Sequence, residues 1–315
     1  MLISYVIPCY KSEKTITSVV EDIRTVMNTH MDYEYEIILI NDSSPDNVYN
    51  VVEELGRNFT NIKGIDLAKN FGQHSALMTG YRYVTGDIVV CMDDDGQTPA
   101  SEVFKLINKL EEGYDVVFAK YPHKKHSFSR NIGSKINEYM ARTLIGKPKD
   151  LAITSYFCCR RFIIDEIIQY QNPYPYIAGL LLRSTNKFAN VQIEHRDRIV
   201  GTSGYTVNKL LSLWMNGFTA FSVKPLRVAT FVGASCAFIG FLYGIYIVLN
   251  KLVFNPMVPL GYSSLLAVTV FLGGLILLML GLIGEYIGRI YISLNKSPQS
   301  VIRKTINIGD LDEKQ

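Results

Sequence analysis

Short apolar runs alternate with amphipathic stretches along residues 1–120. The runs are rich in residues that favour strands, and they occupy residues 3–7, 35–40, 62–67, 88–92 and 115–119. Between them, apolar residues recur at the spacing of one helix face, as in residues 103–110, a helix that Thr98 can cap and Gly113 can end. The alternation predicts an α/β fold, with a mostly parallel sheet that carries helices on both faces.

Two uncharged stretches dominate the C-terminal third of the chain. They cover residues 228–249 and 257–284, and each is longer than the roughly 20 residues that cross the core of a bilayer. We therefore expect two transmembrane helices. A pair of buried helices in a large soluble core is the alternative, but uncharged runs of this length are rare outside membranes.

Basic residues flank these two stretches. Lys224 and Arg227 precede the first stretch, and the connection between the two carries only Lys251. The second stretch is followed by Arg289, Lys296, Arg303 and Lys304. Because positively charged flanks stay on the cytoplasmic side, we expect a multi-pass protein of the cytoplasmic membrane with both termini in the cytoplasm. The spacing of Gly240 and Gly244 would let helices pack closely, within one chain or in a homo-oligomer.

Composition narrows the classes of function. A chain with 48% hydrophobic and 19% charged residues is expected to fold, and its net charge of +3 is too small to predict binding to nucleic acid. The five cysteines form no spaced framework for disulfides or metal ions. This pattern is typical of a reducing compartment.

Polar or turn-forming residues directly follow three of the predicted strands. These are residues 8–10, 41–44 and 93–95. In open α/β sheets the ligand site lies beyond the carboxyl ends of the strands, so the three groups should face one crevice. The sequence has no glycine-rich phosphate loop of the G-x-G-x-x-G or G-x-x-x-x-G-K type. Binding of a diphosphate would therefore depend on a metal ion.

The acidic run after the fourth strand is a candidate metal site. Asp93 and Asp95 are two residues apart, so in an extended chain both carboxylates point to the same side. Oxygen ligands favour Mg²⁺ or Mn²⁺, and Gln97 continues the series with a carbonyl oxygen. An EF-hand loop is excluded because Thr98 and Phe104 stand where it needs glycine and glutamate. A solvated acidic turn remains the alternative.

Five sequence blocks occur in a characteristic order. They are YVIPCY, LINDSSPDN, LAKNFGQHSALMTG, TGDIVVCMDDDGQTP and HRDRIVGTSGYTVNKLLSL. Together they resemble the successive blocks of family 2 glycosyltransferases, and more narrowly the polyprenyl-phosphate glycosyltransferases. That group contains the dolichyl-phosphate mannose synthases and bacterial undecaprenyl-phosphate sugar transferases. The resemblance covers the whole chain through both apolar stretches and implies a GT-A-like α/β domain.

The resemblance also implies which residues hold the sugar donor. The matching positions for the nucleotide are Pro8, Tyr10, Glu13, Asp42, Lys69, Asp93 and Asp94. Those for the Mg²⁺ or Mn²⁺ ion and the diphosphate are Asp93, Asp95 and Gln97. Lys69 stands where an arginine is more usual in the family, and Lys11 where an asparagine is common. The implied donor is a UDP-sugar, with glucose and N-acetylglucosamine as the expected sugars.

Further matching positions concern catalysis. Asp95 is the implied catalytic carboxylate, Lys120 and Arg130 match positions that receive a lipid phosphate, and Arg198 matches one that contacts the donor diphosphate. A flexible loop with Ser203 and Tyr205 would close over the donor. The implied reaction is one displacement with inversion at the anomeric carbon. Because a phosphate monoester is largely ionised at neutral pH, it needs no strong general base.

These expectations divide the chain into four parts. Residues 1–204 would form the cytoplasmic catalytic domain, residues 205–226 an amphipathic juxtamembrane helix, residues 227–291 the two-helix transmembrane region and residues 292–315 a cytoplasmic tail. Apolar residues at helical spacing in 207–221, and also in 132–144, would lie among the lipid headgroups. Packing in an ordinary protein core is the alternative for both.

The expected function is transfer of one sugar from a UDP-sugar to undecaprenyl phosphate at the cytoplasmic face of the membrane, for modification of cell-envelope glycans. A processive polysaccharide synthase would be expected to carry a Q-x-x-R-W signature, but the single tryptophan, Trp214, follows Leu213. A non-catalytic membrane scaffold that binds nucleotide would not need both a metal pair and separate cationic positions.

Overall fold

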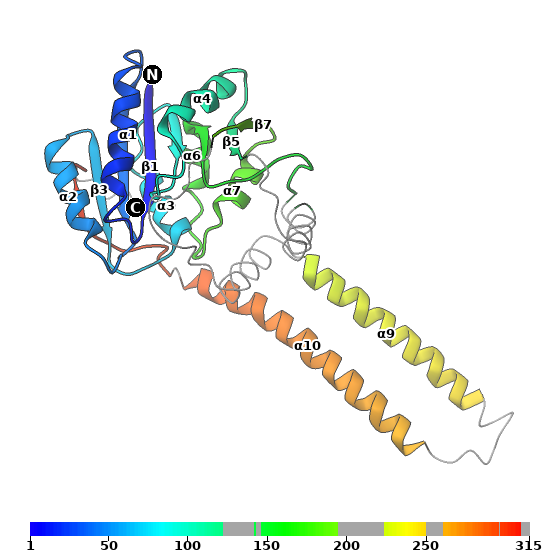
Figure 1. Ribbon diagram of the computed structural model, residues 1–315. Helices are drawn as coiled ribbons and strands as arrows, with labels where there is room; N and C mark the ends of the chain where they lie inside the picture. Colours follow the sequence, from blue (N-terminus) through cyan, green and yellow to red (C-terminus); the bar gives the residue numbers. More distant parts are fainter. Residues whose placement is uncertain (122–141, 143–145, 195–223, 250–260, 296, 310–315) are drawn as a thin grey trace. The chain divides into compact units, whose positions relative to one another are not determined.

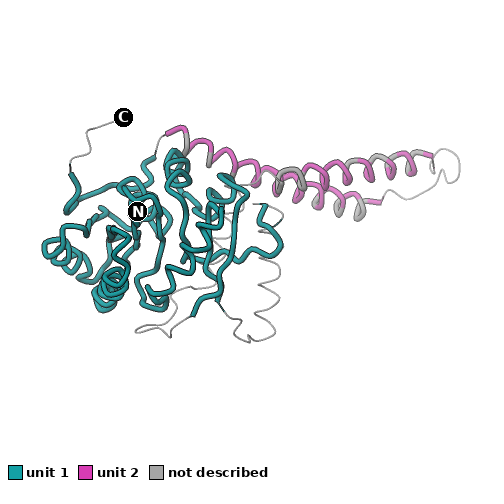
Figure 2. The backbone as a smooth tube through the Cα atoms, turned by 90° about the horizontal axis from the view of Figure 1, so that it is seen from above, with its two compact units in different colours: residues 1–210, 296–315 teal, residues 211–295 magenta. Residues whose placement is uncertain are grey.

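The computed structural model describes residues 1–121, 142, 146–194, 224–249, 261–295 and 297–309. The chain forms two compact units (Figure 2). One contains residues 1–210 together with 296–315, and the other contains residues 211–295. The last residues of the chain therefore belong to the same unit as the first.

The first unit is built around a sheet in which the described residues form eight strands, in the order β7-β5-β6-β4-β1-β2-β3-β8. The strands are β1 (Leu2–Cys9), β2 (Glu34–Asn41), β3 (Ile62–Leu67), β4 (Ile88–Cys91), β5 (Val116–Lys120), β6 (Phe157–Arg160), β7 (Phe188–Gln192) and β8 (Ile302–Ile306). The central strands β4, β1, β2 and β3 run parallel, as does the pair β5 and β7. β6 is antiparallel to both of its neighbours, and β8 is antiparallel to β3.

Helices cover both faces of this sheet (Figure 1). Those of the first unit are α1 (Ile16–Asn28), α2 (Val48–Asn58), α3 (Gln73–Tyr81), α4 (Val103–Glu111), α6 (Arg161–Ile167) and α7 (Ile177–Ser184). The apolar sides of α1, α2 and α4 share one buried core with alternate residues of β1, among them Tyr5 and Ile7. α3 packs on the opposite face, where a Cβ at Gly80 would lie 2.6 Å from Cδ1 of Ile40 and 2.8 Å from Cγ1 of Val6. Only glycine allows this close approach.

The five predicted strands are confirmed as β1 to β5, and the mostly parallel α/β fold is confirmed with them. The predicted start of the helix at 103–110 is wrong. The chain first makes a short 3₁₀ turn at Ala100–Glu102, and the N-cap residue of α4 is Glu102 rather than Thr98. The Thr98 hydroxyl lies 3.4 Å from the Tyr121 hydroxyl. Gly113 does follow the end of α4, with a φ of +104° that suits glycine.

Three strands were not predicted. β6 has four residues, β7 has five, and in β8 the three central residues, 303–305, are exposed. A short strand, or an edge strand with charged side chains, lacks the apolar run that marks a buried strand. Residues 292–315 were expected to form a tail, but residues 302–306 pair with β3 as the edge strand of the sheet.

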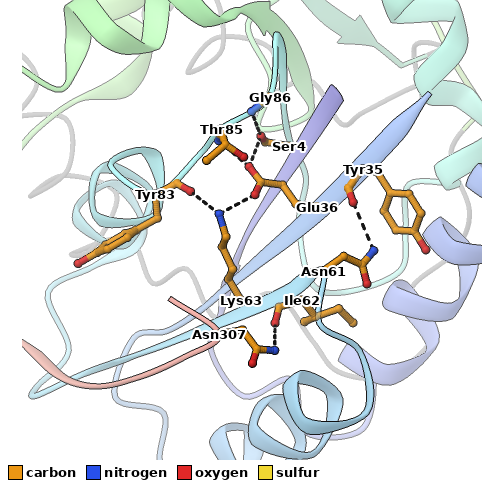
Figure 3. Close-up of polar contacts among 10 residues, drawn as sticks. All are labelled: Ser4, Tyr35, Glu36, Asn61, Ile62, Lys63, Tyr83, Thr85, Gly86 and Asn307. Atoms are coloured by element: carbon orange, nitrogen blue, oxygen red, sulfur yellow. Dashed lines mark hydrogen bonds and ion pairs between the residues drawn. The ribbon is translucent and has the colours of Figure 1, made fainter. Parts of the chain in front are cut away.

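A buried ion pair lies at the amino ends of the central strands (Figure 3). Glu36 lies 2.6 Å from Nζ of Lys63, and it also accepts hydrogen bonds from the Ser4 hydroxyl and the Thr85 backbone N–H, each at 2.6 Å. Burial by itself raises the pKa of Glu36, but the bonds from Lys63, Ser4 and Thr85 outweigh it and hold the pKa below its usual value. Gly86 completes the network by donating to Ser4 over 2.9 Å.

The second unit contains helices α9 (Lys224–Leu249) and α10 (Tyr262–Leu294). Residues 271–288 of α10 are long and apolar enough to cross a membrane, and among the described residues no other helix meets that measure. In α9 the described apolar stretch is the shorter Thr230–Gly240. Many large apolar side chains on both helices are exposed, including Phe231, Phe238, Phe271 and Leu277. The two transmembrane helices therefore stay a prediction.

Candidate active site

The three groups of residues that follow β1, β2 and β4 lie side by side. The Asp42 N–H donates to the carbonyl of Cys9 over 3.1 Å, and the Tyr10 N–H donates to Oδ2 of Asp94 over 2.9 Å. The Lys11 N–H donates to Oγ of Ser44 over 2.7 Å. These bonds tie each strand end to a neighbour. The predicted meeting of the three strand ends is therefore confirmed.

Two of these turns contain residues in the left-handed region of backbone conformation. Lys11 has a φ of +60° and Ser43 a φ of +48°. This conformation costs a residue with a Cβ roughly 1–2 kcal/mol relative to ordinary backbone. The bond from Lys11 to Ser44, and a 3.0 Å bond from the Ser44 N–H to Oδ1 of Asn41, offset that cost. The turns after β1 and β2 thus hold each other in shape.

Asp42 connects the turn after β2 to the loop before α3. Its carboxylate accepts the backbone N–H groups of Phe71 at 2.7 Å and Gly72 at 2.8 Å, and Asn70 donates to its carbonyl over 3.1 Å. Gly72 has a φ of +88°, which favours glycine. Burial raises the pKa of Asp42, and the two backbone bonds partly oppose that shift. Lys69 lies in this loop, with Nζ 5.0 Å from the ring centre of Phe71.

The side chain of Asp93 is held by two other segments of the chain. Gln73, the first residue of α3, donates from Nε2 to Oδ1 over 3.1 Å. The Ser155 hydroxyl makes a short hydrogen bond to Oδ2. Both oxygens of Asp93 thereby accept hydrogen bonds from uncharged side chains, and such bonds orient a carboxylate.

Asp94 and Asp95 have different surroundings. Asp94 accepts the Tyr10 N–H, and burial raises its pKa to about 6. The Thr15 hydroxyl donates to its carbonyl over 2.7 Å. Asp95 accepts the backbone N–H of Gln97 over 3.1 Å. Asp94 therefore stabilises the turn after β1. The role of each aspartate in binding a nucleotide or metal ion stays a prediction.

Asp93 and Asp95 suit a divalent cation that is shared with a ligand. Both are half-buried at the end of β4 and offer hard carboxylate oxygens. Within the described ranges, no group of three or more His, Cys, Asp or Glu side chains is placed to enclose a metal ion. Mg²⁺ and Mn²⁺ are often held by one or two carboxylates together with substrate phosphates, so two aspartates fit such an ion.

The remaining predicted donor residues lie around the same strand ends. Pro8 pairs with Ile40 in the register of β1 and β2, and the Tyr10 side chain is 45% exposed. The Glu13 carboxylate accepts the Asn47 N–H over 3.2 Å. Lys120 is exposed at the carboxyl end of β5. Arg130, Arg198, Ser203 and Tyr205 lie outside the described residues, as do residues 207–221 and most of 132–144.

Sequence reasoning missed Gln73 and Ser155 as partners of Asp93. The antiparallel register of β4 and β6 pairs Cys91 with Phe157, and its continuation sets Ser155 opposite Asp93. This register could not be predicted from the sequence, because β6 is short and was itself not predicted. Gln73 lies in one of the family-like blocks, yet its contact with Asp93 depends on how α3 packs on the face of the sheet.

Comparison with known proteins gives two family matches. Residues 4–169 match the family described as glycosyl transferase family 2. Residues 224–290 match the GtrB C-terminal hairpin. The first match covers more than half of the chain, and it contains the three strand ends described above.

Whole-chain relatives and solved structures agree with these matches. The undecaprenyl-phosphate 4-deoxy-4-formamido-L-arabinose transferase of Proteus mirabilis is 32% identical, with 99% of this chain and 96% of the relative covered. YkcC of Bacillus subtilis, described as an uncharacterized glycosyltransferase, is 31% identical over 97% of this chain and 94% of its own. The fold is similar to that of glucosyl-3-phosphoglycerate synthase from Mycobacterium tuberculosis, solved with Mn²⁺, UDP-glucose and phosphoglyceric acid (TM-score 0.51, 17% identity, 67% of this chain and 75% of that one). The chain therefore belongs to glycosyl transferase family 2, as its resemblance to the polyprenyl-phosphate glycosyltransferases predicted.

Proposed function

We propose that the protein transfers one sugar from a UDP-sugar to undecaprenyl phosphate at the cytoplasmic face of the membrane. The observation that carries this proposal is the half-buried pair Asp93 and Asp95 at the carboxyl end of β4, in a chain of family 2. Hydrogen bonds from α3 and from the segment before β6 orient Asp93 there. The acceptor follows from the Proteus relative, whose name specifies undecaprenyl phosphate.

Asp93 and Asp95 are the residues that would hold Mg²⁺ or Mn²⁺, with Gln97 as a further oxygen ligand. When bound, such an ion would neutralise negative charge that develops on the departing UDP. Gln73 and Ser155 keep the Asp93 carboxylate in one orientation. This preorganisation lowers the cost of bringing the carboxylates to the ion.

The nucleotide would lie over the turns after β1 and β2, where Pro8, Tyr10, Glu13, Asp42 and Lys69 are its proposed contacts. The backbone bonds between these turns support the proposal because they fix the shape of that edge of the sheet. Both oxygens of the Asp42 carboxylate accept backbone N–H groups, so Asp42 also positions the loop before α3. The exposed ring of Tyr10 is a surface on which a base can stack.

The acceptor phosphate would meet the cations Lys120 and Arg130, and Arg198 would contact the donor diphosphate. Lys120 supports this arrangement because its exposed side chain follows β5 at the carboxyl side of the parallel strands. Arginine suits phosphate because its planar fork donates two hydrogen bonds at once. Ser203 and Tyr205 belong to the proposed donor loop. An already ionised phosphate needs no deprotonation, which agrees with the absence of a carboxylate in residues 153–157.

We further propose that both apolar stretches span the membrane and that both termini are cytoplasmic. The hairpin match over residues 224–290 and the apolar length of α10 support this topology, together with the basic flanks. The bilayer would thus hold the enzyme next to its lipid acceptor.

Three donor sugars are candidates. Glucose and N-acetylglucosamine are the expectations from the family resemblance. The name of the Proteus relative adds 4-deoxy-4-formamido-L-arabinose as a third. A panel of labelled UDP-sugars distinguishes them.

The test is an assay of the purified full chain with undecaprenyl phosphate, Mn²⁺ or Mg²⁺ and that panel. The proposal predicts that one labelled sugar enters the lipid fraction as a single residue, and that the reaction stops when EDTA is added. A labelled polymer would instead indicate a processive synthase. If nucleotide binds but no sugar is transferred from any donor, a binding scaffold is the better description.

A further inference from the structure

The edge strand β8 has an irregular register beside the candidate active site. It pairs Asp66 with Lys304 and Leu67 with Ile302, so Arg303 is the additional residue of a β-bulge. A bulge redirects a side chain and is common next to active sites. The bulge lies opposite Asp66 and Leu67, the last two residues of β3, so it is at the carboxyl end of β3, which borders the nucleotide turns.

Arg303 makes two contacts there. Its Nη1 lies 3.3 Å from Oδ2 of Asp66, and its Nη2 donates to the carbonyl of Ala68 over 2.7 Å. The same guanidinium therefore holds the end of β3 and the first residue of the loop that leads to α3. Its fixed planar geometry suits such a double contact.

The first contact leads to the turn after β2. Asp66 is 5% exposed, and its other oxygen accepts Nδ2 of Asn41 over 2.7 Å. Asn41, which is 4% exposed, in turn accepts the Ser44 N–H. Ser44 then receives the Lys11 N–H. Arg303 is thus connected to the turns after β2 and β1 through a buried carboxylate and a buried amide.

The second contact leads to the same place by another route. Ala68 is followed by Lys69, and the loop then reaches Phe71 and Gly72, whose N–H groups bind the Asp42 carboxylate. Ala68 is also fixed by β8 itself, since its N–H donates to the Val301 carbonyl over 2.8 Å. Both routes from Arg303 therefore end within residues 42–44.

The neighbouring cation on β8 has a different environment. Lys304 lies 2.6 Å from Glu53 on α2, and its side chain is 53% exposed, compared with 59% for Arg303. Lys304 contacts helix α2 through Glu53, whereas the partners of Arg303 lead to the nucleotide turns. Lys304 is therefore a matched control for Arg303. Its loss tests attachment of β8 to the rest of the domain, whereas loss of Arg303 also tests positioning of the nucleotide turns.

We propose that Arg303 is a positioning residue for the sugar donor: it holds the turn after β2 and the loop before α3 in the shape that binds the UDP part. This inference rests on the proposed function. Only residues 295–301 separate α10 from β8 in the sequence, so the chain that leaves the membrane-type helix would complete the donor site.

The test is calorimetric titration of the full chain in detergent with UDP and Mn²⁺, comparing wild type, Arg303→Met and Lys304→Met. We expect Arg303→Met to raise the Kd for UDP about tenfold, at the low end of the effect of losing a residue that orients a binding group. Lys304→Met should change the Kd less than about twofold, because its ion pair is exposed and joins β8 to α2 rather than to the nucleotide turns. In the transfer assay Arg303→Met should raise KM for the donor and leave kcat nearly unchanged, and Arg303→Lys should recover part of the loss.

Equal weakening by both methionine variants would overturn the inference, because β8 would then act only through attachment to the sheet. If wild type binds UDP and Arg303→Met binds it with the same Kd, the inference about Arg303 is wrong, but the proposed function is unaffected. No UDP binding by wild type would contradict the proposed function and the inference together. If Arg303→Met does not fold, the double variant Asp66→Asn/Arg303→Met is used instead. It leaves no unpaired buried carboxylate at position 66, and the same tenfold increase in the Kd for UDP is expected.

Discussion

The two ends of the central strands treat buried carboxylates in opposite ways. At the amino ends, Glu36 is paired with Lys63 and receives two more hydrogen bonds, which hold its pKa below the usual value despite burial (Figure 3). At the carboxyl ends, Asp42 and Asp94 accept backbone N–H groups, and burial raises the pKa of both. One end uses its charges for stability, whereas the other keeps acidic groups in a geometry suited to a ligand.

Residues that stabilise the fold therefore lie at the amino ends, and the residues proposed to act in the reaction lie at the carboxyl ends. The amino-end network is complete within the protein, because Lys63 also donates to the Tyr83 carbonyl over 3.0 Å. The carboxyl end collects half-buried aspartates that nearby neutral donors orient. Changes at the first end should alter the free energy of unfolding, and changes at the second should alter transfer.

The largest effect is expected for Asp95→Ala. Loss of a proposed metal ligand should lower sugar transfer about 10³-fold, comparable to the loss of a major electrostatic contact in an active site. The melting temperature should stay close to that of wild type, since removing like charge from an acidic run relieves repulsion. Radiolabel in the lipid fraction measures the first quantity, and thermal unfolding in detergent measures the second. Transfer at more than a tenth of the wild-type rate would refute the role of Asp95.

Lys63→Met probes the other end of the sheet. Removing one partner of a buried pair leaves Glu36 uncompensated, and the free energy of unfolding should fall by about 3 kcal/mol. At temperatures where the variant is folded, KM and kcat should match the wild-type values. A lower kcat with an unchanged free energy of unfolding would show that the amino ends also act in transfer, contrary to this account.

Ser155→Ala should have an intermediate effect. Loss of the hydroxyl that orients Asp93 is expected to raise the Mn²⁺ concentration needed for half-maximal transfer about tenfold or more, as for other residues that orient a ligand group. Ser184→Ala is the matched control, because the Ser184 hydroxyl bonds to the Leu180 carbonyl within α7. A metal titration of transfer activity compares the two. Equal curves for both variants would remove Ser155 from the site.

The smallest effect concerns pH. Because the pKa of Glu36 is lower in the folded protein than in the unfolded chain, its stabilising contribution is present above the unfolded value, about 4.3, and is lost as the pH falls through the folded value. Glu36→Gln should therefore melt below wild type at neutral pH, and the difference should shrink toward about pH 3. Melting curves across this range measure the difference. A constant difference at every pH would mean that ionisation of Glu36 does not stabilise the fold.

The sequence predicted the parallel half of the sheet well, because β1 to β4 are mostly apolar and nearly all of their residues are buried. It could not predict β8, whose central residues 303–305 are charged or polar and exposed, nor the short β6. The acidic run was visible in the sequence, and so was its place at a strand end. The partners Ser155, Gln73 and Arg303 were not, since each reaches the site through strand register or helix placement.

The measurement that tests the central claim most directly is anomalous diffraction at the manganese edge from crystals of the full chain with UDP and Mn²⁺. The account predicts one strong peak within coordination distance of the Asp93 and Asp95 carboxylates, bridging them to the diphosphate. A diphosphate bound away from the end of β4, or manganese at another position with these two aspartates unliganded, would contradict it.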